Sequence, residues 1–312
     1  MLSLDDVRAA AARIAGKVRR TPLIAAAPSK RSLGDGVVSY KLECLQVTGS
    51  FKSRGAISKL ATLSASEIAK GLVTASGGNH GLAIAYAGWL TGRPATIFVP
   101  ENVSPAKAVK IKEWGAELIV TGKVWDESNR AAMAHVARTG ATYVHPFADF
   151  AIMAGQGTIA LELFEDDETI DTLIVAIGGG GLIAGIATAA KALNPSMRII
   201  GVEPVGAPTL HASLAAGRVV ELPEITTTVP TMAARKTEAI NFEIIRRHVE
   251  EIVLVSDEEM REAARYLWFD SGLAVDLSGA AAVAALLTGR VHAEAGSRTC
   301  ALVCGAGADG IA

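Results

Sequence analysis

Residues 171–193, DTLIVAIGGGGLIAGIATAAKAL, decide the fold class. A continuous apolar run that ends in glycines and leads into a helical pattern is typical of a buried parallel strand turning into a helix. Gly178, Gly179, Gly180 and Gly181 would let backbone N–H groups converge on an anion at the helix start, where the helix dipole adds to the attraction. A plain turn is the alternative, but four glycines cost backbone entropy that a plain turn does not require. The stretch therefore predicts an α/β sheet with a phosphate-binding loop.

The same alternation of strands and helices runs through the chain in two series, one over residues 72–122 and the other over residues 171–305. The strands are continuous apolar runs, as expected where helices cover both faces of a parallel sheet. We therefore expect two lobes built on parallel sheets. A second glycine-rich loop, ASGGNHG at residues 75–81, follows a strand of the first series. Three tryptophans on predicted helices have apolar neighbours and are expected in the core: Trp89, Trp114 and Trp268.

Length and composition favour small-molecule chemistry. The chain has 312 residues, half of them apolar, and its 30 basic and 32 acidic side chains nearly cancel, so we expect neither a nucleic-acid nor a membrane partner. No apolar stretch reaches the roughly 20 residues of a spanning helix. The first 20 residues place acidic side chains early and basic ones late, which predicts a capped amphipathic helix and not a signal peptide, and hence a cytoplasmic protein. Cys44, Cys300 and Cys304 lack the spacing of a disulfide framework or a zinc site.

Lys52 lies in an unusual local sequence, TGSFKSRGA at residues 48–56. A lone lysine is most often a solvated surface charge. Here small residues and Phe51 surround it immediately ahead of a predicted helix, which indicates a close-packed site. A lysine desolvated in such a site has the lowered pKa that Schiff-base chemistry needs.

A dinucleotide site is a rival interpretation of the glycine loop at residues 178–181. Gly179, Gly181 and Ala184 fit a loose G-x-G-x-x-A fingerprint, and Glu203 ends the next strand where a ribose-binding acid would lie. A nicotinamide-dependent dehydrogenase would leave the 75–81 loop and the lysine segment without roles. A noncatalytic small-ligand binder on the same scaffold is a further alternative.

SFKSRGA, SGGNHG and GGGG, in this order and at these separations, resemble the fold type II pyridoxal-phosphate enzymes, in their serine/threonine dehydratase and serine racemase branch. HPFAD, AGQGTIALEL, VEPVGAP and NFEII match that branch too, so the resemblance covers essentially the whole chain. It implies a two-lobed fold like tryptophan synthase β, with helix-flanked parallel sheets and the cofactor between the lobes. Residues 1–63 and 149–312 would form the large cofactor-binding domain and residues 64–148 the small one. A homodimer is also expected.

The resemblance also implies roles for individual residues, with pyridoxal 5'-phosphate as cofactor. Lys52 would form the Schiff base and later act as general base, while Phe51 packs against the cofactor ring. Asn79 would donate to the phenolic oxygen, and Cys304 would face the pyridine nitrogen. The phosphate would be held by Gly178, Gly179, Gly180 and Gly181, and the substrate carboxylate by Ser76 and the backbone of Gly77, Gly78, Asn79 and His80.

The activity implied is α,β-elimination, which converts an L-3-hydroxy amino acid of the serine or threonine type to a 2-oxo acid and ammonia. A thiol such as Cys304 does not keep the pyridine nitrogen protonated as an aspartate would, so elimination is favoured over transamination. Racemases of this branch carry a second serine in the carboxylate loop, where this chain has Gly77. Serine racemase is therefore an alternative that we rank below dehydratase.

Three departures from the family pattern concern metal and substrate. Relatives that bind a divalent metal use a glutamate and a later aspartate, but here Thr209 follows Glu203, so Glu203 is only a weak metal candidate. The usual ADG segment reads Thr231, Met232, Ala233, and Met232 could reshape a pocket or repack a loop. The usual VEPSGA reads VDLSGA, with Asp276 and Leu277. A non-standard substrate such as 3-hydroxyaspartate or phenylserine thus stays open.

Overall fold

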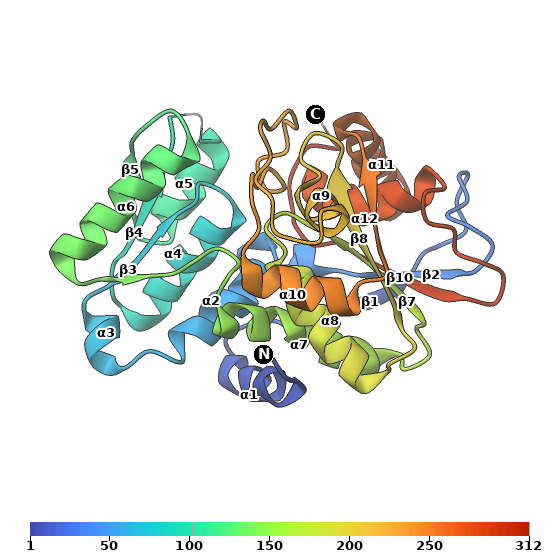
Figure 1. Cartoon of the computed structure of the whole chain (residues 1–312), viewed down its shortest axis with the longest axis horizontal. Helices are drawn as coiled ribbons and strands as arrows, with labels where there is room; N and C mark the ends of the chain where they lie inside the picture. The colour runs from blue at the N-terminus through green and yellow to red at the C-terminus, as the bar shows by residue number, and fades with distance from the viewer. Residues whose placement is uncertain (102, 312) are drawn as a thin grey trace.

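The computed structural model describes residues 1–101 and 103–311 and contains two parallel sheets flanked by helices, as predicted (Figure 1). The strands are β1 Leu23–Ala25, β2 Val37–Lys41, β3 Leu72–Ala75, β4 Ala95–Val99, β5 Glu117–Val120, β6 Thr142–Tyr143, β7 Thr172–Ala176, β8 Arg198–Pro204, β9 Glu251–Val255 and β10 Arg298–Leu302. The helices are α1 Leu4–Ile14, α2 Lys52–Leu60, α3 Ala65–Ala69, α4 Asn79–Thr91, α5 Pro105–Glu113, α6 Trp125–Thr139, α7 Phe150–Asp166, α8 Gly181–Leu193, α9 Thr209–Ala215, α10 Ala239–His248, α11 Asp257–Ser271 and α12 Leu277–Leu287.

The larger sheet has the strand order β1-β2-β10-β7-β8-β9 and lies on the right in Figure 1. All its pairings are parallel except that of the short edge strand β1 with β2. Its central strand β7 is buried at every position, which explains the unbroken apolar run TLIVA. The last strand, β10, pairs with β2 near the N-terminus, so the two ends of the chain build one sheet.

The smaller sheet has the order β5-β4-β3-β6, is parallel throughout, and lies on the left in Figure 1 with α4, α5 and α6. All its strands fall within residues 72–143, and all strands of the larger sheet fall outside that range. The domain boundaries after residues 63 and 148 stay a prediction, which this division of strands supports.

Glycines allow three helices to pack closely and so join the predicted lysine and phosphate segments. A Cβ added at Gly155 of α7 would lie 2.6 Å from the Arg54 carbonyl oxygen of α2. A Cβ added at Gly185 of α8 would lie 2.0 Å from the Met153 carbonyl oxygen of α7. Larger side chains would therefore force these helices apart. The start of α2 is held against α7, and α7 against α8.

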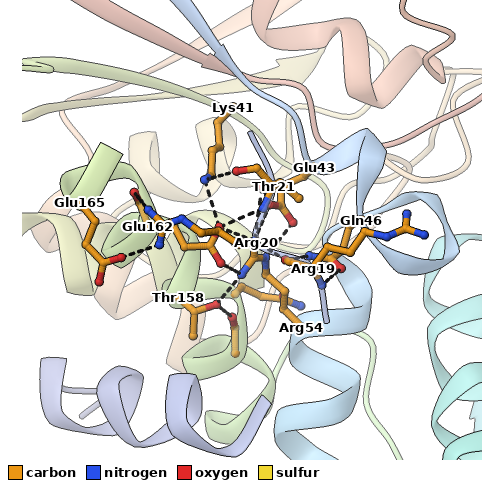
Figure 2. Close-up of polar contacts among 12 residues, drawn as sticks. Arg19, Arg20, Thr21, Lys41, Glu43, Gln46, Arg54, Thr158, Glu162 and Glu165 are labelled. Carbon is orange, nitrogen blue, oxygen red and sulfur yellow. Dashed lines mark hydrogen bonds and ion pairs between the residues drawn. The ribbon is translucent and has the colours of Figure 1, made fainter. Parts of the chain in front are cut away.

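A buried ionic cluster fixes α2 to the large lobe (Figure 2). The guanidinium of Arg54, which is fully buried, lies 2.8 Å from a carboxylate oxygen of Glu43 and 2.6 Å from one of Glu162. Lys41, also fully buried, pairs with Glu162 at 3.0 Å and with Asp166 at 3.1 Å. Burial opposes the charge of Arg54, but Glu43 and Glu162 raise its pKa above the ordinary value, so the guanidinium stays charged.

No helix within the described residues combines the length and the apolar character needed to cross a membrane.

Candidate active site

The segments expected to bind cofactor and substrate follow the carboxyl ends of strands. The carboxylate loop, residues 76–80, follows β3, and the phosphate loop, residues 178–181, follows β7. Cys304 comes two residues after the end of β10. Ligands of parallel α/β sheets bind at this edge. The fold therefore brings together segments that are far apart in the chain.

Lys52 opens helix α2, and its amine points at the segment that follows β6. Its Nζ donates a hydrogen bond of 2.6 Å to the Pro146 carbonyl oxygen and lies 5.2 Å from the centre of the Phe51 ring. Burial lowers the pKa of Lys52 to about 8. A larger share of the amine is then neutral, and so nucleophilic, near neutral pH than for an exposed lysine. This is the property that the sequence predicts for Lys52.

The phosphate loop forms a cradle at the start of α8, a helix of 13 residues. A Cβ at Gly179 would lie 2.4 Å from the Phe147 ring, and one at Gly181 would lie 2.3 Å from the Phe147 carbonyl oxygen. Gly180 has a φ of 94°, which disfavours any residue with a side chain. Only glycines fit here, and the first N–H groups of α8 have no partner within the helix. An anion would supply that partner.

Two side chains hold the phosphate loop: Thr237, which lies just before α10, and Asn241, which lies within that helix. Thr237 Oγ1 and Asn241 Nδ2 both donate to the Gly179 carbonyl oxygen, at 3.0 and 2.8 Å. Because the C=O and N–H of a trans peptide unit point in opposite directions, these two bonds also fix the direction of the Gly180 N–H.

The carboxylate loop leads into α4, whose first residue is Asn79. The Gly78 N–H donates to Ser76 Oγ at 3.4 Å. The first N–H groups of α4 have no partner within the helix, so an anion could accept from them. His80 is buried, and burial lowers its pKa to about 3, so the ring is neutral; its Nε2 lies 3.1 Å from the Val144 carbonyl oxygen. His80 therefore offers the site its backbone N–H and not a charge.

Asn79 and Cys304 both lie close to the buried carboxylate of Asp276. Asn79 Nδ2 donates to Asp276 Oδ2 at 3.0 Å, and the Cys304 thiol donates to the Ser278 carbonyl oxygen at 3.3 Å. Burial, reinforced by Asp276, raises the pKa of the Cys304 thiol well above its ordinary value. The Phe51 N–H donates to the Cys304 carbonyl oxygen at 3.3 Å, which ties this group to the lysine segment.

Comparison with known proteins identifies the family. The sequence profile of the family described as "Pyridoxal-phosphate dependent enzyme" matches residues 14–305. The chain belongs to this family. The resemblance predicted from SFKSRGA, SGGNHG and GGGG is thereby confirmed, and pyridoxal phosphate is the cofactor. The nicotinamide-dependent dehydrogenase and the noncatalytic binder lose their support.

Similar proteins cover nearly the whole chain. The L-threonine ammonia-lyase of Geobacter sulfurreducens is 41% identical over 302 residues, which are 97% of this chain and 75% of that protein. Among solved structures, maize serine racemase is 35% identical with a TM-score of 0.93, covering 98% of this chain and 93% of its own. The T.th. threonine deaminase is 36% identical with a TM-score of 0.90, covering 97% of this chain and 98% of its own. The predicted fold type II architecture is thus confirmed.

The residues of this pyridoxal-phosphate enzyme fit its cofactor. A cradle without room for any Cβ suits the phosphate, and the amine of Lys52, with its lowered pKa, suits covalent attachment. The lysine and the phosphate loop contact neighbouring residues of one segment: Pro146 accepts from Lys52, and Phe147 packs on the phosphate loop.

Cofactor capture by the apoenzyme should follow the titration of Lys52. The neutral amine is the nucleophile, so the capture rate should rise about tenfold between pH 7 and pH 9 and then level off, as a pKa of about 8 requires. Stopped-flow absorbance of apoenzyme mixed with pyridoxal phosphate measures this rate. A rate still rising steeply above pH 9 would show that the lysine has an ordinary pKa and would contradict the pKa lowered by burial.

The carboxylate of Glu203 has a structural role. Its two carboxylate oxygens accept from the Leu210 and His211 N–H groups, both at 2.8 Å, at the start of α9. Burial raises its pKa to about 7. The hydroxyl of Thr209, the second position of the metal pattern considered in the sequence, donates to the Ala234 carbonyl oxygen. Within residues 1–101 and 103–311, no three His, Cys, Asp or Glu side chains are grouped to hold a metal ion.

The Met232 side chain is 1% exposed and packs in the core of the large lobe, although its Cα lies 3.4 Å from a Cβ built on Gly178. Thr231 approaches both loops: its carbonyl oxygen lies 2.7 Å from a Cβ built on Gly178, and its methyl carbon 3.6 Å from one built on Gly78. Of the two interpretations of Met232, the structure favours the repacked loop.

Several residues that shape the site carry no recognisable signal in one sequence. Pro146 and Phe147 belong to HPFAD and Asn241 to NFEII, which match the family without revealing these contacts. Asp276 stands out in the sequence only as a departure from the family pattern, yet it contacts Asn79.

Proposed function

We propose that this enzyme converts L-threonine or L-serine to the corresponding 2-oxo acid and ammonia. One observation carries the proposal. The Lys52 amine, whose pKa is lowered to about 8, donates to the Pro146 carbonyl oxygen, and the next residue, Phe147, packs on the phosphate loop. Curated relatives at 38–41% identity are named L-threonine ammonia-lyases.

In this proposal the residues keep the roles inferred from the family. Lys52 anchors the cofactor, Phe51 packs near its ring, Asn79 donates to its phenolic oxygen and Cys304 faces its pyridine nitrogen. The phosphate is bound by Gly178, Gly179, Gly180 and Gly181, and the substrate carboxylate by Ser76 and the N–H groups of Gly77, Gly78, Asn79 and His80.

The protein's own groups then move one proton and orient the substrate. The α4 start binds the substrate carboxylate, with the helix dipole favouring the anion. The Lys52 amine, in its neutral form, would take the proton from the substrate Cα. The bound cofactor supplies the electron sink that stabilises the charge left there. The protonated Lys52 amine would return this proton to the β-hydroxyl, which leaves as water as its bond to Cβ breaks. The enamine that is released then reacts with a water molecule to give the 2-oxo acid and ammonia.

Cys304 favours elimination over transamination. Because burial keeps its thiol protonated, it offers the pyridine nitrogen a neutral partner. The electron sink is therefore weak, so charge at Cα is short-lived and a β-leaving group is lost quickly.

The substrate test is a panel of L-threonine, L-serine, L-threo-3-hydroxyaspartate and 3-phenylserine, with 2-oxo acid release as readout. The Met232 side chain packs in the core of the large lobe, so its departure from the family pattern does not by itself indicate a different substrate pocket. We expect the highest kcat/KM with L-threonine or L-serine. A preference of more than about tenfold, or 1.4 kcal/mol, for 3-hydroxyaspartate or phenylserine would contradict this substrate.

Racemisation should be a trace activity. In this proposal Lys52 moves the Cα proton on one side of the substrate, and Gly77 has no side chain that could donate a proton on the other. A Cβ added at Gly77 would lie 2.6 Å from Val103 Cγ2, so a serine there meets a side chain in the way.

We expect G77S alone to disturb the loop, and G77S combined with V103A to form D-serine from L-serine at a raised rate. V103A alone is the matched control, and chiral chromatography is the readout. Substantial D-serine from the unaltered enzyme would overturn this assignment of Gly77.

We also propose a cytoplasmic homodimer. Trp268 and Phe269 on α11 are 45% and 77% exposed, and aromatic side chains of this kind are enriched in oligomer interfaces. Sedimentation equilibrium of the holoenzyme tests the dimer.

A further inference from the structure

We propose that Asp276 is a positioning residue that sets the orientation of the Asn79 amide across the two lobes, so that its nitrogen faces the cofactor. This inference rests on the proposed role of Asn79 as donor to the phenolic oxygen.

The two oxygens of the Asp276 carboxylate have separate tasks. Oδ1 caps helix α12, accepting from the Gly279 N–H at 2.7 Å and from Ser278 Oγ at 2.7 Å. Oδ2 reaches the other lobe, where it accepts from Asn79 Nδ2 at 3.0 Å and lies 3.9 Å from Lys107 Nζ. The cap fixes the carboxylate, and the fixed carboxylate holds Asn79.

The chemistry of the pair decides which way the Asn79 amide points. An ionised carboxylate only accepts hydrogen bonds, so it selects the NH2 end of the amide and rejects the carbonyl end. An amide nitrogen carries two hydrogens, and the bond to Asp276 leaves the second for an acceptor on the cofactor. Asp276 therefore keeps Asn79 as a donor toward the phenolic oxygen.

The residues around Asp276 and Asn79 favour the hydrogen bond between them. Asp276 is 5% and Asn79 is 7% exposed, so water competes little for either group. A Cβ added at Gly305 would lie 2.8 Å from Asp276 Oδ2 and 3.0 Å from Asn79 Nδ2. Lys107 supplies the positive charge that offsets the buried carboxylate.

A double-mutant cycle on cofactor affinity tests the inference. The variants are D276N, N79A and the double variant, with D309N as control. Asp309 is exposed and accepts from the Leu277 N–H at the same helix start, but has no contact with Asn79 among the hydrogen bonds of the described residues. Asparagine caps helices as well as aspartate, so D276N keeps α12 capped. Apoenzyme is titrated with pyridoxal phosphate by equilibrium dialysis.

We expect D276N to weaken pyridoxal-phosphate binding about tenfold, because the amide in its place no longer selects the NH2 end of Asn79. In the N79A background the same substitution should change affinity less than about twofold, since the two residues act as one unit. The absorption band of the loaded enzyme should shift in D276N and N79A and stay unchanged in D309N.

Two different results would overturn the inference, and they are distinguishable. If N79A binds the cofactor as tightly as the unaltered enzyme, the proposed role of Asn79 fails and the inference falls with it. If N79A binds weakly while D276N binds normally, or the two losses add independently, Asn79 keeps its role and Asp276 does not act through it.

Discussion

Replacing Lys52 with alanine should lower turnover of L-threonine by more than about 10⁴-fold while the fold remains intact. The general base alone contributes about 10²–10⁴-fold, and loss of the covalent anchor adds to that. Alanine is well tolerated within a helix, so α2 should persist. The measurement is 2-oxo acid release at saturating pyridoxal phosphate, with circular dichroism to confirm folding.

Lys59 provides the matched control on the same helix. Its Nζ pairs with Asp149 at 2.7 Å, at a partly exposed position. K59A should therefore keep turnover and lose little stability. Activity in K52A within tenfold of that in K59A would remove Lys52 from its proposed role.

Replacing Arg54 with methionine should destabilise the protein by about 3–5 kcal/mol, since it leaves Glu43 buried and without its cationic partner. Methionine is close to arginine in length and linear, so most of the packing is kept and the effect reports the charge. Urea unfolding followed by fluorescence gives the free energy. Adding E43Q should recover part of the loss, because the uncompensated charge is then removed.

Arg20 is the control within the same cluster (Figure 2). It pairs with Glu165 and Asp166, but its side chain is 49% exposed. R20M should therefore cost less than about 1 kcal/mol. Equal losses in R20M and R54M would contradict the view that burial makes the Arg54 contacts decisive.

The strand, loop and helix units could be predicted because their signals are local. An apolar run, a glycine loop and a helical pattern lie within a short stretch, as in β7 and α8. The strands β1 and β2 were not predicted, since β1 has three residues and both depend on pairing with distant segments. The expected core positions of Trp89 and Trp268 were wrong: both lie on the predicted helices but are 58% and 45% exposed.

The site was predictable as a set of segments and not as a set of contacts. Lys52 and the two glycine loops carry their own sequence patterns. The bonds from Lys52 to Pro146 and from Asn79 to Asp276 join residues 94 and 197 positions apart, and no local pattern encodes such distances. A single sequence therefore indicates which residues carry the chemistry, but not which distant residues contact them.

The most direct test of the central claim is to find which lysine carries the cofactor. The holoenzyme is reduced with sodium borohydride, which fixes pyridoxal phosphate to its lysine, and the digested protein is mapped by mass spectrometry. Our account predicts one modified peptide, with the phosphopyridoxyl group on Lys52. Modification of another lysine, or none in a protein saturated with cofactor, would contradict it.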